Sequence, residues 1–266
     1  MIRFVTAIAM VLGTQLHAEP IKLAVTTSFN NSGLSDILLP QIKDDTGLEV
    51  QLLVVGTGQA LRLGEAGDVD AVLVHSRTAE EAFVAQGHAT HRREVMYNDF
   101  VLIGPAHDPA SVSAATTVTD AIRQIASAKA AFVSRGDESG THKKERALWS
   151  ASQLDPESFG PWYKSVGAGM GAGLNIASSL NAYILSDRAS WLTHGNKQDL
   201  RILFSGVAQL FNQYSYLPVN PERHAHVNYA AALKLESWLT SDVAKELIDG
   251  YTLNGEELFV FNAQPR

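Results

Sequence analysis

The residues best suited to chemistry form one dense polar run, residues 134–142, which reads Ser-Arg-Gly-Asp-Glu-Ser-Gly-Thr-His. An apolar segment precedes the run, and a segment with helical spacing follows it. Where an apolar strand ends in Gly-rich polar residues and a helix begins, several backbone N–H groups lack helical partners and point into one loop. Ser139 and Thr141 add hydroxyl donors, and Arg135 adds a permanent charge with five N–H donors. The run therefore predicts an anion-binding loop.

Two other interpretations of this run stay open. Arg135 could form a salt bridge with Asp137 or Glu138 that only stabilises the loop. Ser139, with His142 nearby, could be the nucleophile of an exported hydrolase. The residues around Ser139 do not match the nucleophile elbow, in which a glycine lies two residues before the serine. We therefore expect a binding protein rather than an enzyme.

The composition restricts the class of protein. The 266 residues, 45% hydrophobic and 18% charged, can bury a substantial core as one large domain or two lobes. The formal net charge of -7, without a Lys/Arg cluster, argues against a nucleic-acid partner. The chain has no cysteine, which excludes disulfides, thiol-ligated metals and a lipid on an N-terminal cysteine. The histidine pairs and Gly-rich turns lack the spacing of metal or dinucleotide sites, so we expect no metal ion and no cofactor.

The first residues have the pattern of an export signal. Arg3 supplies the positive start, residues 4–12 form a short apolar core, and residues 16–18 end in a small residue before Glu19. This pattern predicts a signal peptide at residues 1–18. The apolar core is too short to span a bilayer, and no other stretch of the sequence could span one. We therefore expect a periplasmic protein of a bacterium with two membranes, without membrane insertion or a lipid anchor.

The order of strand, polar turn and helix recurs along the chain and predicts an α/β fold with mostly parallel strands. The expected strands are residues 21–25, 48–55, 71–74, 95–103, 130–133, 182–185, 200–204 and 214–219. The expected helices are residues 34–45, 60–63, 78–85, 118–128, 143–151, 174–180, 227–239 and 242–249. Pro40 should kink the first of these helices or end it early.

Strand ends that offer hydrogen-bond donors lie in two separate parts of the chain, residues 26–58 and residues 134–188. Ligands of open α/β sheets bind at the carboxyl ends of strands, and small-molecule sites often lie between domains. The sequence therefore predicts two α/β lobes that enclose one ligand in a cleft.

Five stretches of the sequence carry a family resemblance, namely residues 54–61, 95–100, 134–142, 169–171 and 219–221. Together they resemble the tungstate-binding proteins of tungstate ABC transporters (TupA type). The resemblance keeps the same order from about residue 23 to residue 259, so it covers essentially the whole mature chain.

The resemblance implies a type II periplasmic-binding-protein fold. In this fold two lobes, each a mostly parallel sheet flanked by helices, are joined by two crossing strands around an oxyanion cleft. The crossings would fall near Gly104 and residues 211–214, so that lobe 1 comprises residues 19–103 and 212–266 and lobe 2 comprises residues 104–211. The resemblance also implies a monomer whose closed form is recognised by an integral-membrane ABC permease.

The resemblance further implies the binding residues. They are Thr27 and Ser28 in the first loop, Thr57 in the second loop, Arg135, Ser139 and Thr141 in the central loop, and backbone N–H groups around Gly140 and Gly171. The family tends to have a longer Thr/Ser run in the first loop, where this chain has Val25 before and Phe29 after its hydroxyl residues.

The protonation of the anion separates the candidate ligands. Tungstate and molybdate are doubly charged and carry no proton at neutral pH, so a site made only of donors suits them. Phosphate keeps a proton, and an Asp137 carboxylate that pointed at the ligand would favour it. If Asp137 instead faces back to the loop or pairs with Arg135, tungstate or molybdate is expected. We expect high-affinity tungstate binding with molybdate as a close second ligand, and phosphate or sulfate binding is the alternative within the same fold.

Overall fold

The computed structural model describes residues 20–137 and 139–264. The predicted signal peptide, residues 1–18, and Glu138 lie outside the described residues. The strands are β1 (Ile21–Thr26), β2 (Val50–Val55), β3 (Ala71–Val74), β4 (Arg93–Pro105), β5 (Phe132–Ser134), β6 (Tyr163–Ser165), β7 (Tyr183–Asp187), β8 (Leu200–Phe204), β9 (Phe211–Pro218), β10 (Thr252–Leu253), β11 (Glu256–Glu257) and β12 (Val260–Phe261).

The helices alternate with the strands through most of the chain. They are α1 (Thr27–Asn31), α2 (Leu34–Thr46), α3 (Thr57–Ala66), α4 (Arg77–Ala85), α5 (Val118–Ala128), α6 (Gly140–Ala151), α7 (Met170–Leu180), α8 (Arg188–Thr193), α9 (Tyr229–Leu239) and α10 (Asp242–Asp249). Three short 3-10 helices are η1 (Val112–Ala114), η2 (Pro156–Ser158) and η3 (Ala208–Leu210).

Within the described residues, ten strands form one mixed sheet in the order β2-β1-β3-β9-β4-β7-β5-β6, and β8 and β12 also pair with β4. β1 is parallel to β2 and β3, and β5 is parallel to β6 and β7. The long strand β4 is antiparallel to β9 along residues 93–99 and antiparallel to β7 along residues 100–103. Because β4 changes its partner halfway, it connects two groups of parallel strands.

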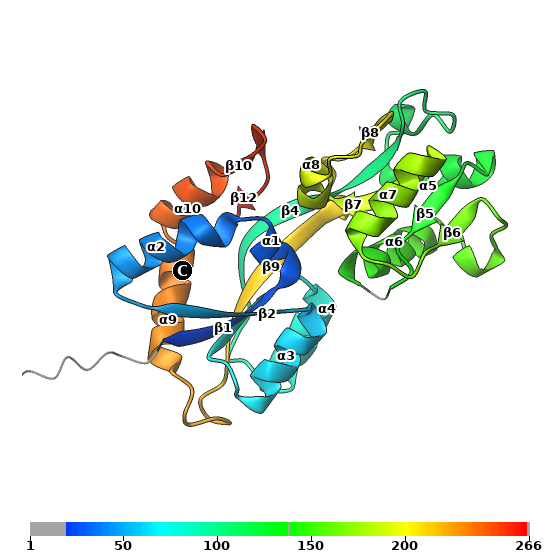
Figure 1. The fold of residues 1–266 in the computed structure, drawn as a ribbon. Helices are drawn as coiled ribbons and strands as arrows, with labels where there is room; N and C mark the ends of the chain where they lie inside the picture. Colours follow the sequence, from blue (N-terminus) through cyan, green and yellow to red (C-terminus); the bar gives the residue numbers. More distant parts are fainter. Residues whose placement is uncertain (1–19, 138, 265–266) are drawn as a thin grey trace, which may run out of the picture.

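Figure 1 shows these two groups, with β4 and β9 running between them. We call β1 to β3 with α1 to α4, α9 and α10 the first lobe, and β5 to β8 with α5 to α8 the second lobe. The chain enters the second lobe along β4 and returns along β9, so the first lobe is discontinuous. The residue bounds expected for the lobes stay a prediction.

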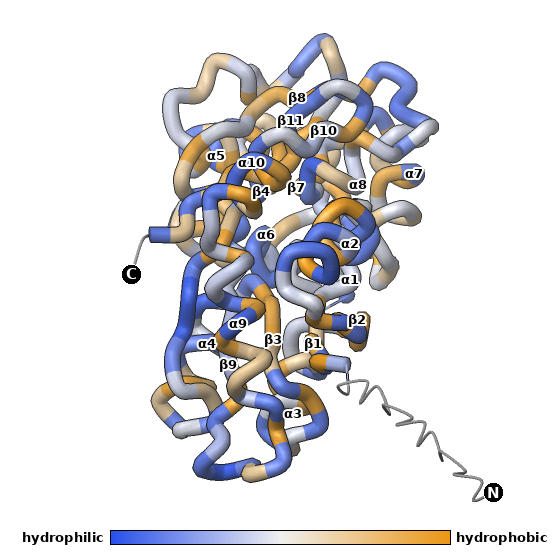
Figure 2. Tube along the Cα trace, turned by 90° about the vertical axis from the view of Figure 1, so that its left-hand side faces the viewer, coloured by the Kyte–Doolittle hydropathy of each residue, from blue (hydrophilic) through white to orange (hydrophobic). Residues whose placement is uncertain are grey.

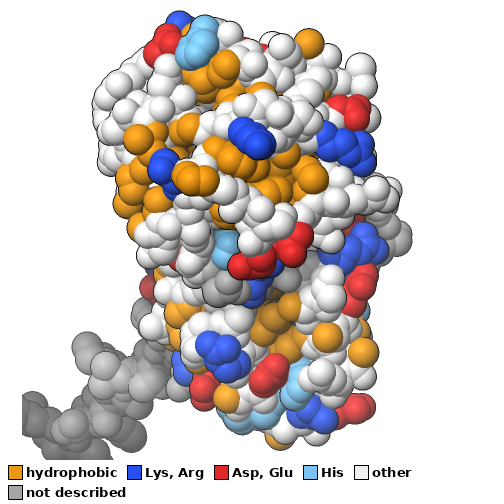
Figure 3. Space-filling model, turned by 90° about the vertical axis from the view of Figure 1, so that its right-hand side faces the viewer, with side chains coloured by type: hydrophobic (Ala, Val, Ile, Leu, Met, Phe, Trp, Pro, Cys, Tyr) orange, Lys and Arg blue, Asp and Glu red, His pale blue; other side chains and the backbone are white. Residues whose placement is uncertain are grey.

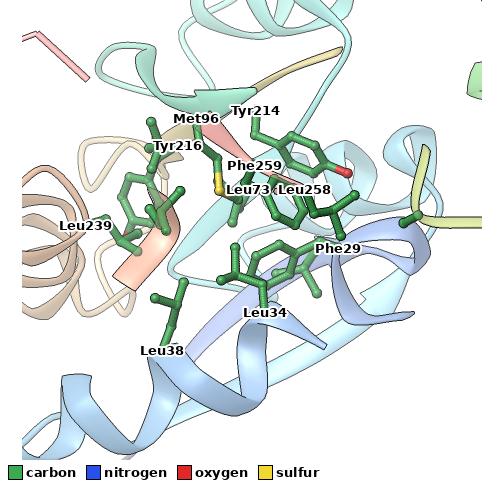
Figure 4. Packing of buried hydrophobic residues seen from close by; sticks show 14 of the residues in the cluster. Phe29, Leu34, Leu38, Leu73, Met96, Tyr214, Tyr216, Leu239, Leu258 and Phe259 are labelled. Atoms are coloured by element: carbon green, nitrogen blue, oxygen red, sulfur yellow. The ribbon is translucent and has the colours of Figure 1, made fainter. Parts of the chain in front are cut away.

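The largest hydrophobic cluster packs α1, α2, α9 and α10 against the sheet of the first lobe and continues into the second lobe. Phe29, Leu34, Tyr214 and Phe259 are among its members, and Figure 4 shows their side chains side by side. Hydrophobic residues also run along β1, β2 and β3 in Figure 2, whereas the turns at the lower end of the molecule are hydrophilic. This packing holds the carboxyl end of β1, where the first predicted loop begins.

Most predicted elements are present. The expected strand at residues 200–204 and the expected helix at residues 242–249 coincide with β8 and α10. Of the kink or early end predicted at Pro40, the early end is wrong, because α2 continues to Thr46, and the kink stays a prediction. Leu34, Leu38 and Ile42 are buried on one face of α2, and Pro40 is exposed, so packing outweighs the missing N–H.

Two findings concern the surface of the protein. No helix in the described part of the chain is long and apolar enough to cross a membrane. On the face seen in Figure 3, Lys and Arg side chains are interspersed with Asp and Glu side chains, and no extended basic field forms.

Candidate oxyanion site

A cavity of about 320 Å³ lies between the two lobes. It is lined by Thr27, Ser28, Asn31, Arg135, Met170, Gly171, Asp187, Ala189, Ser190 and Thr193. The first three of these residues belong to α1 in the first lobe, and the others come from the loop after β5, the start of α7, the end of β7 and α8. Its volume falls near the lower end of the range for small-molecule sites, roughly 300–1,000 Å³. The cavity brings together four residues of the predicted site: Thr27, Ser28, Arg135 and Gly171.

The first loop places its hydroxyl groups at the cavity because the residues on either side are buried. Thr26 ends β1, and its Oγ1 accepts a hydrogen bond of 3.3 Å from the Phe29 N–H, which caps α1. The Phe29 side chain is 3% exposed and packs in the hydrophobic cluster. Phe29 therefore anchors the short loop from inside, which leaves Thr27 and Ser28 facing the cavity.

The Arg135 guanidinium contributes positive charge to the cavity. Its Nη2 lies 2.5 Å from Asp137 Oδ2, so Arg135 forms the salt bridge that was one interpretation of the central run. The Arg135 Nε is buried and has no hydrogen-bond partner among the described residues. A buried donor without a partner is unfavourable, and Arg135 lines the cavity in which an anion would supply acceptors.

Asp137 faces back to its own loop. Its Oδ1 accepts a hydrogen bond of 3.3 Å from the Ser139 N–H, and its Oδ2 pairs with Arg135. Partial burial acts to raise the pKa of Asp137, but hydrogen bonds from Ser139 and the Arg135 charge outweigh it and hold the pKa below its ordinary value. Asp137 is therefore an ionised acceptor that is already occupied within the loop.

The start of α7 adds backbone donors. Gly169 is its N-cap and forms no side-chain cap hydrogen bond, and Gly171 lines the cavity. The first N–H groups of a helix without a capping side chain are free to bind an anion, and the helix dipole favours negative charge there. The backbone of Gly171 therefore lies at the cavity, and its predicted ligand role stays a prediction.

The other residues expected in the central loop do not line the cavity. Ser139 is the N-cap of α6, and its Oγ accepts a hydrogen bond of 3.3 Å from the His142 N–H. Thr141 is 7% exposed in the first turn of the same helix, and Gly140 begins it. The predicted ligand roles of Ser139, Gly140 and Thr141 stay predictions.

Thr57 is also outside the cavity lining. It is the first residue of α3, directly after Gly56, and it is partly buried. The structure thus places the second loop at the start of a helix, as the sequence predicts, but not at this cavity. The ligand role of Thr57 likewise stays a prediction.

The structure adds cavity residues that the sequence did not indicate, chiefly Asn31, Ser190 and Asp187. Asp187 is the N-cap of α8, and its Oδ1 accepts a hydrogen bond of 2.8 Å from the Ser190 N–H. The sequence does contain one signal for this helix, an N-cap aspartate before Ala189, Trp191 and Leu192. The helix has only six residues, however, which is too short to show helical periodicity.

An ion pair holds α8 in place as one wall of the cavity. Arg188 donates two hydrogen bonds to Asp99 in β4, at 2.6 Å from Nε and 2.7 Å from Nη2. Glu256 in β11 lies 3.5 Å from Arg188 Nη1. Two parallel bonds from one guanidinium fix orientation as well as distance, so α8 is fixed to the strand that connects the lobes.

No group of three or more His, Asp or Glu side chains in residues 20–137 and 139–264 is arranged to hold a metal ion. The cavity instead offers hydroxyl and backbone donors, a guanidinium group and one capping carboxylate. Chemically, this arrangement can bind an anion that accepts hydrogen bonds.

The fold and the cavity define a two-lobed anion-binding protein. Comparison with known proteins agrees with this class. A model of the PBP superfamily domain matches residues 13–243. The chain is 44% identical to the tungstate-binding protein TupA of Peptoclostridium acidaminophilum, over 91% of this chain and 85% of that protein. Its fold matches the structure of the tungstate-binding protein TupA from Desulfovibrio alaskensis G20 with a TM-score of 0.89 and 43% identity, over 93% of this chain and all of that chain.

A structure described as the tungstate ABC transporter from Geobacter sulfurreducens matches with a TM-score of 0.77 and 45% identity, over 88% of this chain and 99% of that one. The architecture is therefore the type II periplasmic-binding-protein fold, as predicted. The chain belongs to the PBP superfamily and, within it, to the TupA family of tungstate-binding proteins.

Proposed function

We propose that this protein binds tungstate, with molybdate as a second ligand, and delivers it to the permease of an ABC transporter. The observation that carries this proposal is the cavity between the lobes, where Thr27 and Ser28 face Arg135 and Gly171. Relatives that are 44% and 36% identical are tungstate-binding proteins, which supports tungstate as the anion.

The orientation of the carboxylates favours an anion without a proton. Asp137 accepts hydrogen bonds from its own loop, and Asp187 caps α8. Asp137 uses both carboxylate oxygens within its loop and is therefore no acceptor for a protonated oxygen such as the one that phosphate retains, whereas Asp187 uses only Oδ1 in its cap. Arg135, the hydroxyl groups and the helix start are all donors, which suits tungstate and molybdate.

The alternative of an exported hydrolase has less support. Its proposed nucleophile, Ser139, caps α6 through its hydroxyl oxygen and does not line the cavity. We propose that the protein is a transport component and not an enzyme, and that it uses no cofactor.

Location and assembly complete the proposal. We propose that residues 1–18 direct export, that the mature chain is a periplasmic monomer without a lipid anchor, and that its remaining partner is the integral-membrane permease. Closure of the two lobes around the anion would give the permease a surface to recognise, since a ligand shifts the population toward the state that it binds better.

Calorimetric titration of the mature, desalted protein with tungstate, molybdate, sulfate and phosphate tests the proposal. We expect tight one-to-one binding of tungstate and molybdate and no heat from sulfate or phosphate. Binding of phosphate alone would favour the alternative ligand of the same fold. The absence of binding heat with all four anions would contradict an oxyanion-binding function.

A further inference from the structure

The Ser28 hydroxyl has more polar neighbours than an isolated serine in a loop would need. Its Oγ lies 3.0 Å from Thr26 Oγ1, 3.1 Å from His75 Nε2 and 3.0 Å from Tyr214 Oη. Ser28 also lines the anion cavity. A hydroxyl group has one hydrogen and two lone pairs. If its hydrogen points to an anion that only accepts, its oxygen can accept hydrogen bonds from two of these three neighbours.

His75 is placed to be one of these donors. It follows β3 directly, and its ring packs on the Tyr214 ring with centroids 4.8 Å apart. Burial lowers the pKa of His75 to about 4, against hydrogen bonds with its own backbone and Asn212 that raise it. The imidazole is therefore neutral at neutral pH and carries a single N–H, on either Nδ1 or Nε2.

We propose that His75 is a positioning residue for anion binding: its Nε2–H donates to Ser28 Oγ in the loaded protein and so directs the Ser28 hydroxyl hydrogen into the cavity. This inference rests on the proposed function. The Tyr214 hydroxyl, which can donate to the same oxygen, assists His75 from β9, the strand that pairs with β3.

The chain around His75 is held in a way that suits this role. The N–H of Ser76, the next residue, donates to Glu80 Oε1 at 2.5 Å, and Glu80 Oε2 accepts from Arg92 Nε at 2.6 Å. Glu80 is completely buried. The backbone that carries His75 is therefore anchored to α4 and to the segment before β4.

The second lobe also approaches His75. A Cβ atom placed on Gly140 would lie 3.4 Å from His75 Cε1, which is van der Waals contact. The imidazole of His75 thus lies in the first lobe close to the start of α6 of the second lobe. A side chain at position 140 would therefore contact the imidazole, and glycine leaves this space open.

A pair of matched variants tests the inference. The amide nitrogen of His75→Gln can reach the place of Nε2, whereas that of His75→Asn reaches only the place of Nδ1. Both substituted side chains are polar and uncharged, so they differ chiefly in length. By calorimetry with tungstate we expect His75→Gln to stay within about threefold of the wild-type Kd and His75→Asn to bind about tenfold more weakly.

Measuring tungstate affinity for the same two variants in a Ser28→Ala background distinguishes an effect of His75 on Ser28 from a general loss of structure. If His75 acts through Ser28, His75→Asn and His75→Gln should then differ by less than about twofold, because the hydroxyl they act on is gone. Equal affinities of the two variants with Ser28 present, or an undiminished difference without it, would overturn the inference. A wild-type protein that does not bind tungstate would instead contradict the proposed function.

A measurement on the wild-type protein decides the question if His75→Asn does not fold. Nitrogen NMR of isotope-labelled histidine distinguishes the two neutral tautomers, and His75→Gln assigns the signal. We expect the Nε2–H tautomer with tungstate bound. The Nδ1–H tautomer in the tungstate-bound protein would overturn the inference, because Nε2 would then accept from Ser28.

Discussion

Arg135 Nη2 and Asp137 Oδ2 lie 2.5 Å apart, so the charged side chains of the central loop pair with each other. This pair orients Arg135 at the cavity and occupies the carboxylate that would otherwise face the ligand. Arg135 still has N–H groups to offer, including the buried Nε. The orientation of Asp137, which bears on the choice between a proton-free anion and phosphate, is thus set within one tight loop.

Arg135→Ala should weaken tungstate binding by roughly 1.5–3 kcal/mol, about 10- to 150-fold in Kd, because it removes a charge-assisted donor. Calorimetric titration measures the change. Arg146→Ala is the matched control, since Arg146 lies on α6, is exposed and pairs with the exposed Glu157. An unchanged Kd in Arg135→Ala would show that the anion binds elsewhere.

Ser139→Ala should lower the free energy of unfolding by about 1 kcal/mol, the usual contribution of a helix N-cap. Its Oγ accepts from the His142 N–H, so the hydroxyl already has a structural role. Because Ser139 does not line the cavity, we expect the tungstate Kd to change by less than about threefold, against the ligand role that the family resemblance implies. Urea denaturation and calorimetry together test this. A loss of affinity above tenfold with unchanged stability would instead show that the Ser139 hydroxyl binds the anion.

Gly136→Ala should destabilise the protein by roughly 1–3 kcal/mol, since alanine is unfavourable at positive φ and the space is filled. Gly136 has a φ of +62°, and a Cβ there would lie 1.9 Å from Ser165 Oγ. Gly169→Ala is the control, because no atom of the described residues beyond its chain neighbours lies within 4 Å of its Cβ position and its φ is -62°. Equal unfolding midpoints for the two variants would contradict this account of the loop.

His75 should make stability depend on pH in a defined window. Its pKa in the folded protein, about 4, lies below the ordinary value of 6.5, so the unfolded chain binds more protons between these values. Stability should therefore fall as the pH drops from about 6.5 to about 4, by an amount on the order of 3 kcal/mol. The titratable group packed on the ring, Tyr214, has its pKa raised to about 12 and stays protonated throughout.

The comparison of wild type with His75→Gln in urea denaturation at pH 7 and pH 4.5 measures this contribution. The variant lacks the titrating group, so it should lose less stability than the wild type on acidification. Identical losses in both proteins would show that His75 is not held neutral by the fold.

Much of the fold could be predicted from sequence because apolar strands and Gly-rich turns are strong local signals. The residues of β8 and α10 were predicted without error, and Thr27, Ser28, Arg135 and Gly171 do share one cavity. Distances between lobes are not encoded in local patterns. For that reason Asn31 and Ser190 were missed, and His75 reaches Ser28 only through the pairing of β1 with β3.

The direction of the Asp137 side chain illustrates the same limit. Sequence shows a carboxylate two residues after Arg135 but not whether it faces the ligand or the loop. Only the arrangement of the loop, with the Ser139 N–H turned toward Asp137, decides between them.

A crystal of the mature protein grown with tungstate, with data collected at a tungsten absorption edge, tests the central claim most directly. The anomalous difference map should show one tungsten peak in the cavity, with its oxygens within hydrogen-bond distance of Ser28 Oγ, an Arg135 nitrogen and the Gly171 N–H. A tungsten peak outside this cavity, for example in the hollow lined by His142, Lys143 and Arg146, would contradict the account.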